Sequence, residues 1–247
     1  MYDLRADLHL HSTLSPCAER SMTPRGLIRA ALAADLAAVA LTDHHAAGNT
    51  PAFLAAAEEA GIWAIPGMEV QTAEEVHLLC FFPDLPRLLA WEEKVLGWLP
   101  EKPNDERFFG PQEIYPPDGG PPRRFTRLLL TAVPRSLDTI YREAASLGGL
   151  CLPAHVDRAG FGLLPQLGLV PPVVPVNHPL EISAMADPDA VRRAFGLEPG
   201  TRFFPSSDAH RPTEVGRRPA MLRVAEASWE EFVLAVAGEG GRRLGME

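Results

Sequence analysis

Histidine and carboxylate side chains recur along this chain at spacings that suit metal binding. Apolar and polar residues alternate in the opening segment, which ends Asp7-Leu-His9-Leu-His11, and such alternation predicts a β-strand. Side chains two positions apart project from one face of a strand, so Asp7, His9 and His11 are expected to point the same way. Two imidazoles in this arrangement can grip one metal ion. The same spacing returns in Asp208-Ala-His210.

Six segments supply a set of eight candidate metal ligands: His9, His11, His44, Glu69, His77, His155, Asp208 and His210. Imidazole and carboxylate together suit zinc, iron or manganese, and eight such groups exceed what one tetrahedral ion needs. We therefore expect two or three ions, with Glu69 bridging two of them. Taken singly, His77 or His155 would more often be a hydrogen-bonded structural histidine. The recurrence of these residue types at six predicted strand ends favours metal binding.

The candidate ligands stand at the ends of about seven short strands that alternate with helices. Strands are expected at 1–11, 37–41, 62–67, 76–82, 150–154, 179–183 and 221–224, and the run 202–205 leads into Asp208 and His210. Helices are expected at 24–36, 49–60, 85–99, 125–147 with an interruption near Pro134, 188–195 and 229–237. Active sites of parallel β/α barrels form at the carboxyl ends of the strands. An α/β barrel would therefore gather the ligands at one rim.

Length and composition predict one large domain, residues 1–247, with Pro- and Gly-rich insertions at about 100–123 and 159–176. The formal net charge of −9 argues against broad binding of nucleic acid, which depends on Lys and Arg neutralising phosphates. Cys17, Cys80 and Cys151 form no CxxC pair, which fits a reducing compartment. With no long apolar run and no signal peptide, we expect a cytoplasmic protein that does not enter a membrane.

Several motifs, taken in order, resemble those of the PHP (polymerase and histidinol phosphatase) family. They are Asp7-Leu-His9-Leu-His11-Ser12, Thr42-Asp43-His44, Glu69, Pro153-Ala-His155 and Ser207-Asp208-Ala-His210. The resemblance runs from about residue 3 to residue 217. It implies a distorted (β/α)7, TIM-like barrel with two or three Zn, Mn or Fe ions at the carboxyl ends of its strands. It also implies hydrolysis of phosphate esters, either small phosphomonoesters or nucleotides and nucleic-acid ends.

The sequence departs from the family after the first motif. Many members continue His-x-His-Ser with Ser-Asp-Gly, whose Asp, sometimes replaced by His, is a further metal ligand. Here the chain reads Ser15-Pro16-Cys17-Ala18-Glu19, with proline where that Asp would stand. Either Cys17 or Glu19 could replace the missing ligand, or Cys17 could be a small buried thiol. Binding of a third ion depends on which alternative holds.

The implied reaction is attack on phosphorus by a metal-activated hydroxide at a di- or trinuclear site, with the ions stabilising the phosphoryl oxygens. Arginine binds phosphate through two parallel hydrogen bonds. Arg158, close after His155, and Arg211, directly after His210, are the predicted phosphate-binding residues, with Arg20 a weaker candidate. Asp43 is predicted to orient a ligating imidazole.

The predicted function is hydrolysis of phosphomonoesters or small nucleotides, so the expected partner is a small phosphorylated substrate. Long nucleic acid is not favoured, because the chain is acidic and shows no clear basic, aromatic-lined groove. Three alternatives remain: a histidinol-phosphate phosphatase, a 3′-to-5′ exonuclease or oligonucleotide phosphatase, and a non-catalytic PHP domain stabilised by metal.

Overall fold

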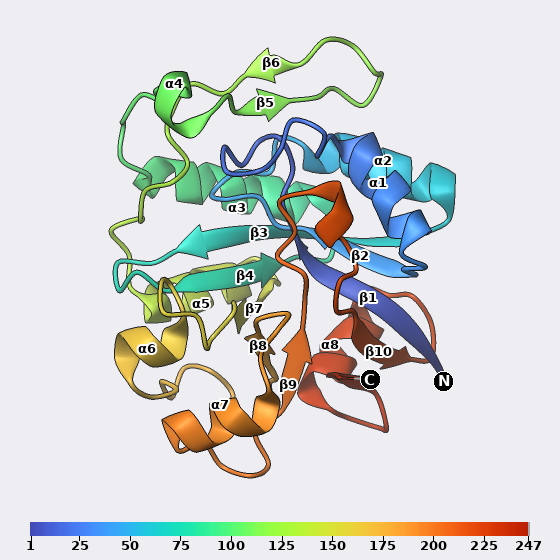
Figure 1. Ribbon diagram of the computed structural model, residues 1–247, viewed down its shortest axis with the longest axis vertical. Helices are drawn as coiled ribbons and strands as arrows, with labels where there is room; N and C mark the ends of the chain where they lie inside the picture. Colours follow the sequence, from blue (N-terminus) through green and yellow to red (C-terminus); the bar gives the residue numbers. More distant parts are fainter. Residues whose placement is uncertain (247) are drawn as a thin grey trace.

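A curled seven-stranded sheet forms the centre of the molecule (Figure 1). The computed structural model describes residues 1–246. The strands run in the order β11-β10-β1-β2-β3-β4-β7. Their bounds are β1 Tyr2–Leu10, β2 Ala38–Leu41, β3 Trp63–Gln71, β4 His77–Phe81, β7 Leu150–Pro153, β10 Ala220–Val224 and β11 Arg243–Gly245. A parallel pair, β8 (Leu180–Ile182) and β9 (Phe203–Pro205), contacts β7 on one side and β10 on the other, so the sheet curls toward closure.

The strand directions give a distorted rather than a regular barrel. β1, β2 and β3 are parallel, whereas β4 is antiparallel to β3 and β7 is antiparallel to β4. Beyond the ends of β1 and β7, the backbone bonds His11 N to Ala209 O and Val156 N to Glu181 O continue the pairing around the ring. The predicted fold class, an α/β distorted TIM-like barrel, is confirmed.

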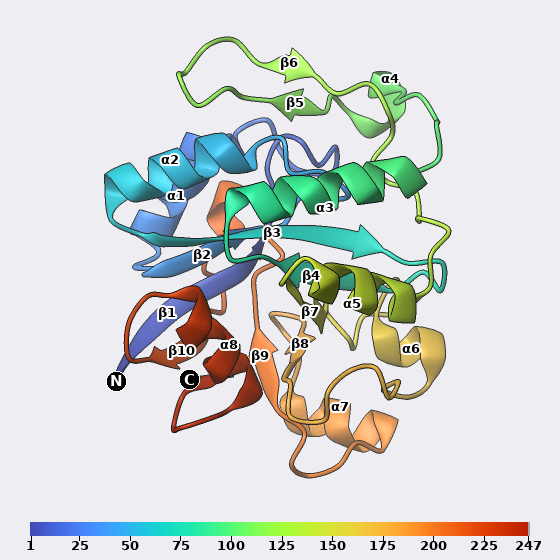
Figure 2. The same ribbon diagram turned by 180° about the vertical axis from the view of Figure 1, so that it is seen from behind.

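Three apolar clusters fill the spaces around this sheet. The cluster inside the curl takes one face of β1, β2, β4, β9 and β10, with Leu8, Phe81 and Phe204 fully buried and Phe232 closing it from α8 (Trp229–Ala237). Helices α1 (Pro24–Ala33), α2 (Thr50–Ala60) and α3 (Leu85–Trp98) cover the outer face (Figure 2). The remaining helices are α4 Glu106–Phe109, α5 Leu137–Ser146, α6 Leu163–Leu167, α7 Pro188–Phe195 and the 3₁₀ turn Pro212–Glu214.

Helix ends agree with local sequence signals. Thr23 accepts a hydrogen bond from Gly26 N before the proline that begins α1. Gly61 ends α2 in the left-handed conformation, with φ of 69°, that glycine adopts without strain. No helix within residues 1–246 combines the length and apolarity needed to cross a membrane.

Two predicted regions were wrong in their secondary structure. The helix expected at 125–147 begins only at Leu137, because the buried Gln112 side chain bonds the carbonyls of Phe125 and Arg127 and the amide of Leu129. These bonds hold residues 125–129 in an extended path. The insertion at 100–123, expected to lack periodic structure, contains α4 and most of a short hairpin of β5 (Glu113–Ile114) and β6 (Arg123–Arg124). The strand β11 was not predicted.

A bulge in β1 corrects the predicted orientation of the first motif. Asp7 pairs with Val39 and Leu10 with Leu41, so Leu8 and His9 together stand opposite a single residue of β2. A bulge of this kind turns a side chain that would otherwise point outward. Asp7 therefore faces away from His9, and its carboxylate accepts hydrogen bonds from the amides of Ser207 and Gly216 instead.

Candidate metal centre

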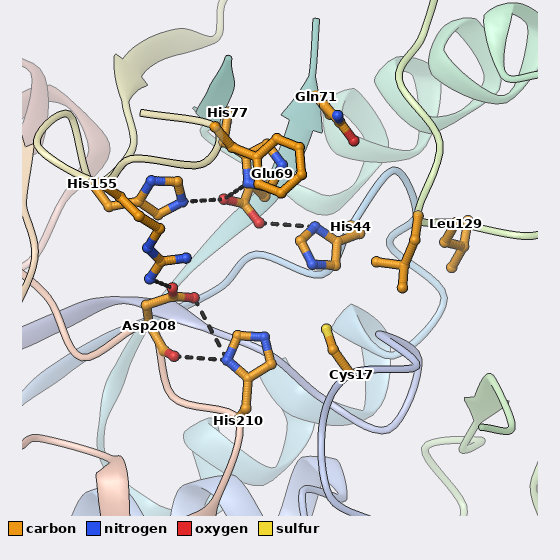
Figure 3. A pocket seen from close by; sticks show the side chains of 12 residues that line it. Cys17, His44, Glu69, Gln71, His77, Leu129, His155, Asp208 and His210 are labelled. Carbon is orange, nitrogen blue, oxygen red and sulfur yellow. Dashed lines mark hydrogen bonds and ion pairs between the residues drawn. The ribbon is translucent and has the colours of Figure 1, made fainter. Parts of the chain in front are cut away.

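All eight predicted ligands converge at one rim of the barrel. His9 and His11 come from the end of β1, His44 follows β2, Glu69 lies in β3, His155 follows β7, and Asp208 and His210 follow β9. His77 begins β4, and because β4 runs antiparallel to β3, its first residue lies beside the end of β3. Figure 3 shows six of these side chains around one pocket, which has a volume of about 250 Å³.

Three side chains offer donor atoms at the spacing of a tetrahedral metal site. His9 Nε2 and His11 Nε2 lie 3.1 Å apart, and Asp208 Oδ1 lies 3.3 and 3.2 Å from them. The Glu69 carboxylate lies beside this group, with Oε1 3.3 Å from His9 Nε2 and Oε2 3.4 Å from His11 Nε2. Ligands held about 2.0–2.1 Å from a tetrahedral zinc ion are separated by about 3.3–3.4 Å. The donor atoms therefore fit such an ion.

Glu69 also reaches three of the four remaining histidines, as a bridging ligand must. Its Oε1 lies 2.7 Å from His77 Nδ1 and 3.3 Å from His155 Nε2, and its Oε2 lies 2.9 Å from His44 Nδ1. Glu69 Oε2 and both ring nitrogens of His155 are buried without a well-formed hydrogen bond. Unpaired buried polar atoms cost about 1–3 kcal/mol each. Metal ions bound between these atoms would remove that cost, so the residues present fit the group that the fold implies.

Second contacts fix the orientation of three of the candidate ligand rings. His9 Nδ1 donates to the Glu181 carboxylate at 3.0 Å, and His210 Nδ1 donates to the Asp208 carbonyl at 2.8 Å. His11 Nδ1 donates to Ser15 Oγ at 3.0 Å. In each case the other nitrogen, Nε2, is left free of that contact, which is the arrangement seen where histidine binds metal.

Asp43 is connected to the candidate ligand His11 only through Ser15. It is buried, and its carboxylate accepts hydrogen bonds from Ser12 N and from Ser15 Oγ, both at 2.7 Å. Ser15 Oγ in turn accepts from His11 Nδ1. The chain of bonds from Asp43 through Ser15 to His11 agrees with the predicted orienting role and gives Asp43 no direct contact with the pocket.

The site concentrates opposite charges that shift several pKa values. Burial alone raises the pKa of Glu69, but His77, His9 and His44 hold it well below its usual range. Asp208 is likewise shifted well below its usual pKa by His9 and His11 despite its burial. Burial lowers the pKa of His77 to about 4. Ionised carboxylates and a neutral His77 imidazole are the states that metal ligands need. Despite burial, Glu181 raises the pKa of His9 and Glu69 raises the pKa of His44 well above 6.5, so these two rings would release a proton when metal binds.

The backbone around the site is strained. Non-glycine residues in the left-handed region include His155 (φ 27°), Asp208 (φ 50°) and Phe161 (φ 65°), all of which line the pocket. Strain of this kind costs about 1–3 kcal/mol per residue and concentrates at functional sites. His45 (φ 53°) lies just behind the pocket, where its ring bonds Leu129 O and Gln71 N. It is a buried structural histidine.

The three predicted arginines differ in position. Arg158 lines the pocket and forms a close ion pair with Asp208 Oδ2, the carboxylate oxygen other than the one facing His9 and His11. Arg211 pairs with Glu19 at 3.2 Å and is not among the pocket-lining residues. Arg20 is exposed and lies 3.6 Å from Glu113. Only Arg158 is therefore close to the histidine cluster.

Cys17 enters the same pocket from the loop after β1. Its sulfur points toward His44 and His210 (Figure 3), although the residue is exposed at the pocket mouth. Burial alone would raise the pKa of the Cys17 thiol, but the charge of His44 and hydrogen bonds with His210 and His44 lower it to about 6. Glu19 points away from the pocket in its ion pair with Arg211.

Sequence reasoning missed Glu181, the buried partner of His9. Besides that contact, Glu181 Oε2 accepts a hydrogen bond from the backbone amide of His155 at 2.8 Å, so one carboxylate supports two ligands. The available signal was a single charged residue inside the apolar strand Leu180-Glu181-Ile182, which is buried throughout. Charged residues are rarely buried unless they are paired.

A barrel rim lined by histidine and carboxylate is typical of metal-dependent hydrolases. The chain belongs to the PHP domain family, whose pattern matches residues 7–132. That family comprises metal-dependent phosphoesterases, so the resemblance drawn from the sequence motifs is confirmed.

Three individual proteins that are similar to this chain differ in what is known of them. Among solved structures, the lesion-specific endonuclease PfuEndoQ from Pyrococcus furiosus is 22% identical, covering 98% of this chain and 58% of its own, with a TM-score of 0.71. A putative metal-dependent phosphoesterase from Bifidobacterium adolescentis is 15% identical over 83% of this chain and 87% of its own, with a TM-score of 0.51. The uncharacterized protein YqxK of Bacillus subtilis is 28% identical over 110 residues, 42% of this chain and only 28% of that protein.

Proposed function

We propose that this protein is a metal-dependent phosphoesterase that hydrolyses phosphomonoesters or small nucleotides. The observation that carries the proposal is the group of His9, His11 and Asp208, whose donor atoms stand 3.1–3.3 Å apart beside the Glu69 carboxylate. His44, His77, His155 and His210 would complete a site for two or three Zn, Mn or Fe ions. When bound, such ions lower the pKa of water and stabilise negative charge on phosphoryl oxygens.

The residues of the chain would bind and orient the substrate. Arg158 reaches the pocket with a planar group of five N–H donors, of which the contact with Asp208 engages Nη2. The remaining donors suit two oxygens of one phosphoryl group. Leu129, Leu130 and Phe161 form an apolar wall of the same pocket and would exclude water from the leaving group. A cavity of about 250 Å³ favours a small ester.

Cleavage of a phosphodiester in DNA is the second candidate. It is supported by the fold shared with endonuclease Q, one structure of which is described as a complex with a 27-mer duplex carrying an abasic lesion at the active site. Helix α4 also exposes Phe108 (85%) next to Arg107, and Glu106 of the same helix lies 3.5 Å from Arg124 of β6. Because the chain spans 58% of that enzyme's length and carries a net charge of −9, we rank this candidate second.

Three other expectations from the sequence stay proposals. Histidinol phosphate is one member of the proposed substrate class. A non-catalytic, metal-stabilised domain would bind metal and show no hydrolysis in the assay. The free thiols Cys80 and Cys151, whose sulfurs lie 3.4 Å apart without a bond, support the proposed cytoplasmic, reducing setting.

The test compares three substrate classes on one preparation. Phosphomonoesters such as p-nitrophenyl phosphate, the diester bis-p-nitrophenyl phosphate and abasic duplex oligonucleotides are incubated with Mn, Zn and Fe added separately. We expect monoester turnover that His9→Ala and Asp208→Ala abolish while circular dichroism stays native. His178→Ala, which removes a histidine outside the cluster, is the matched control and should keep wild-type turnover. Cleavage of the duplex alone would favour the second candidate, and no hydrolysis with any metal would refute both.

A further inference from the structure

The strongest feature that the proposed function leaves unused is the thiol of Cys17. It occupies the pocket mouth together with His44 and His210, and its sulfur is turned toward both rings (Figure 3). A cysteine that merely filled space would be expected against apolar side chains. Here the surroundings are imidazoles, which share with thiolate the ability to bind zinc or iron.

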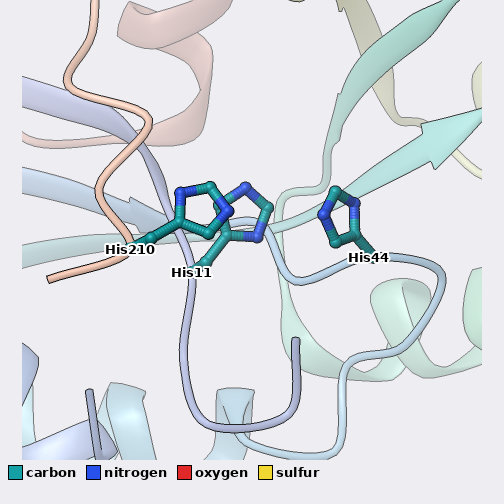
Figure 4. A group of neighbouring side chains, drawn as sticks. All are labelled: His11, His44 and His210. Atoms are coloured by element: carbon teal, nitrogen blue, oxygen red, sulfur yellow. The ribbon is translucent and has the colours of Figure 1, made fainter. Parts of the chain in front are cut away.

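A second observation concerns the histidines themselves. His11, His44 and His210 (Figure 4) offer ring nitrogens that all lie within 4.8 Å of one another, a group that shares His11 with the one around His9. The His210 ring is fixed through Nδ1 by the Asp208 carbonyl, so its Nε2 is the nitrogen left for a ligand. Metal-ligating histidines are typically held in this way through their other nitrogen.

A third observation is a buried carboxylate oxygen aimed at this group. Glu69 Oε2 has no well-formed hydrogen bond although Glu69 is only 1% exposed. It lies 2.9 Å from His44 Nδ1 and 3.4 Å from His11 Nε2. A buried carboxylate oxygen that lies this close to two ring nitrogens without a well-formed hydrogen bond to either is placed where a shared cation would be bound by all three groups.

We propose that Cys17 supplies a thiolate ligand to a third metal ion, held together with His44 and His210. The inference rests on the proposed metal centre and names the residue that replaces the ligand missing at Pro16. Glu19, the other candidate, is engaged with Arg211 on the exterior. Any proton still on the sulfur passes to solvent as the sulfur–metal bond forms.

The donor set also predicts which metal the third site selects. Thiolate with imidazole favours zinc, cobalt or ferrous iron, whereas manganese prefers oxygen ligands. The third site should therefore fill with Zn or Co at concentrations at which Mn leaves it empty. The exposure of Cys17 at the pocket mouth makes the same ligand open to oxidation when no ion protects it.

The test uses the full chain loaded with Co²⁺, whose thiolate complexes show a sulfur-to-cobalt charge-transfer absorption in the near ultraviolet. We expect this band in the wild type. In Cys17→Ala we expect the band to disappear and the bound cobalt to fall by about one ion per chain. Cys17→His should lose the band and keep the ion, because imidazole can take the same position. Cys151→Ala, which removes a buried cysteine of β7, is the control and should keep both.

Three results would overturn the inference. A band that survives in Cys17→Ala would place the thiolate elsewhere. The sulfur would also not be a ligand if the wild type bound two ions without the band and Cys17 reacted equally fast with a thiol reagent before and after metal loading. These first two results would leave the proposed phosphoesterase intact. Failure to bind any ion would refute the metal centre and the thiolate ligand together.

Discussion

Replacing Glu181 by glutamine should weaken metal binding although Glu181 itself would touch no ion. Its two carboxylate oxygens lie 3.0 and 3.1 Å from His9 Nδ1, and Oε2 also accepts from the amide of His155 at 2.8 Å. Glutamine keeps one oxygen acceptor, which can serve only one of these donors well, and it removes the negative charge that makes the His9 ring a stronger ligand. Loss of such an outer partner typically costs about 10- to 100-fold in metal affinity.

That range corresponds to about 1.4–2.8 kcal/mol at the ion held by His9. The assay is competition for Zn²⁺ between the protein and a chromophoric chelator, with the free energy of unfolding of the metal-free protein measured in parallel. Glu231→Gln is the matched control, since Glu231 is a buried carboxylate of α8 that pairs with Arg242, away from the cluster. Equal zinc affinity in Glu181→Gln and wild type would refute the orienting role that we assign to Glu181.

Two further substitutions test the backbone and the core. Gly162→Ala should lower turnover sharply, because its Cβ would stand 2.3 Å from Arg158 O and displace the loop that carries Arg158. Gly160→Ala is the control and should keep wild-type turnover, because nothing lies within 4 Å of the Cβ added there. Equal effects of the two substitutions in steady-state assays would contradict this account. Tyr141→Phe should stabilise the fold by about 1 kcal/mol, because the Tyr141 hydroxyl is buried without a hydrogen-bond partner among the described residues. Burial raises the pKa of Tyr141 well above 10, so the unfolded chain releases this proton first and wild-type stability should fall above about pH 10, a loss that urea unfolding should find reduced in Tyr141→Phe; a less stable variant with an unchanged pH profile would be the contrary result.

The candidate ligands could be predicted from sequence because only a few residue types bind metal ions. His, Asp and Glu at the ends of apolar runs predict a shared rim once those runs form one barrel. The structure gathers all eight at that rim, and whether they bind metal stays a prediction. The direction of β4 was not readable, since nothing in the run from Val76 to Phe82 distinguishes a parallel strand from an antiparallel one. His77 lies at the rim because β4 runs antiparallel and begins there.

Contacts between distant segments account for what sequence reasoning could not supply. The bulge that separates Asp7 from His9 depends on the pairing of β1 with β2, and alternation within β1 alone predicts the opposite orientation for Asp7. Glu181 supports His9 across 172 positions of sequence. Gln112 prevents a helix at 125–129 through bonds that no local pattern announces. In each case a single buried side chain or pairing register overrides a reasonable local prediction.

The central claim is that bound metal ions perform phosphoester hydrolysis at the rim of this barrel. The most direct measurement is the rate of p-nitrophenyl phosphate hydrolysis as the metal-free protein is titrated with Mn²⁺ or Zn²⁺, with bound metal determined on the same samples. The account predicts no turnover without metal, and a rate that rises with occupancy and levels off at two or three ions per chain. Full occupancy without hydrolysis, or hydrolysis that is independent of bound metal, would contradict it.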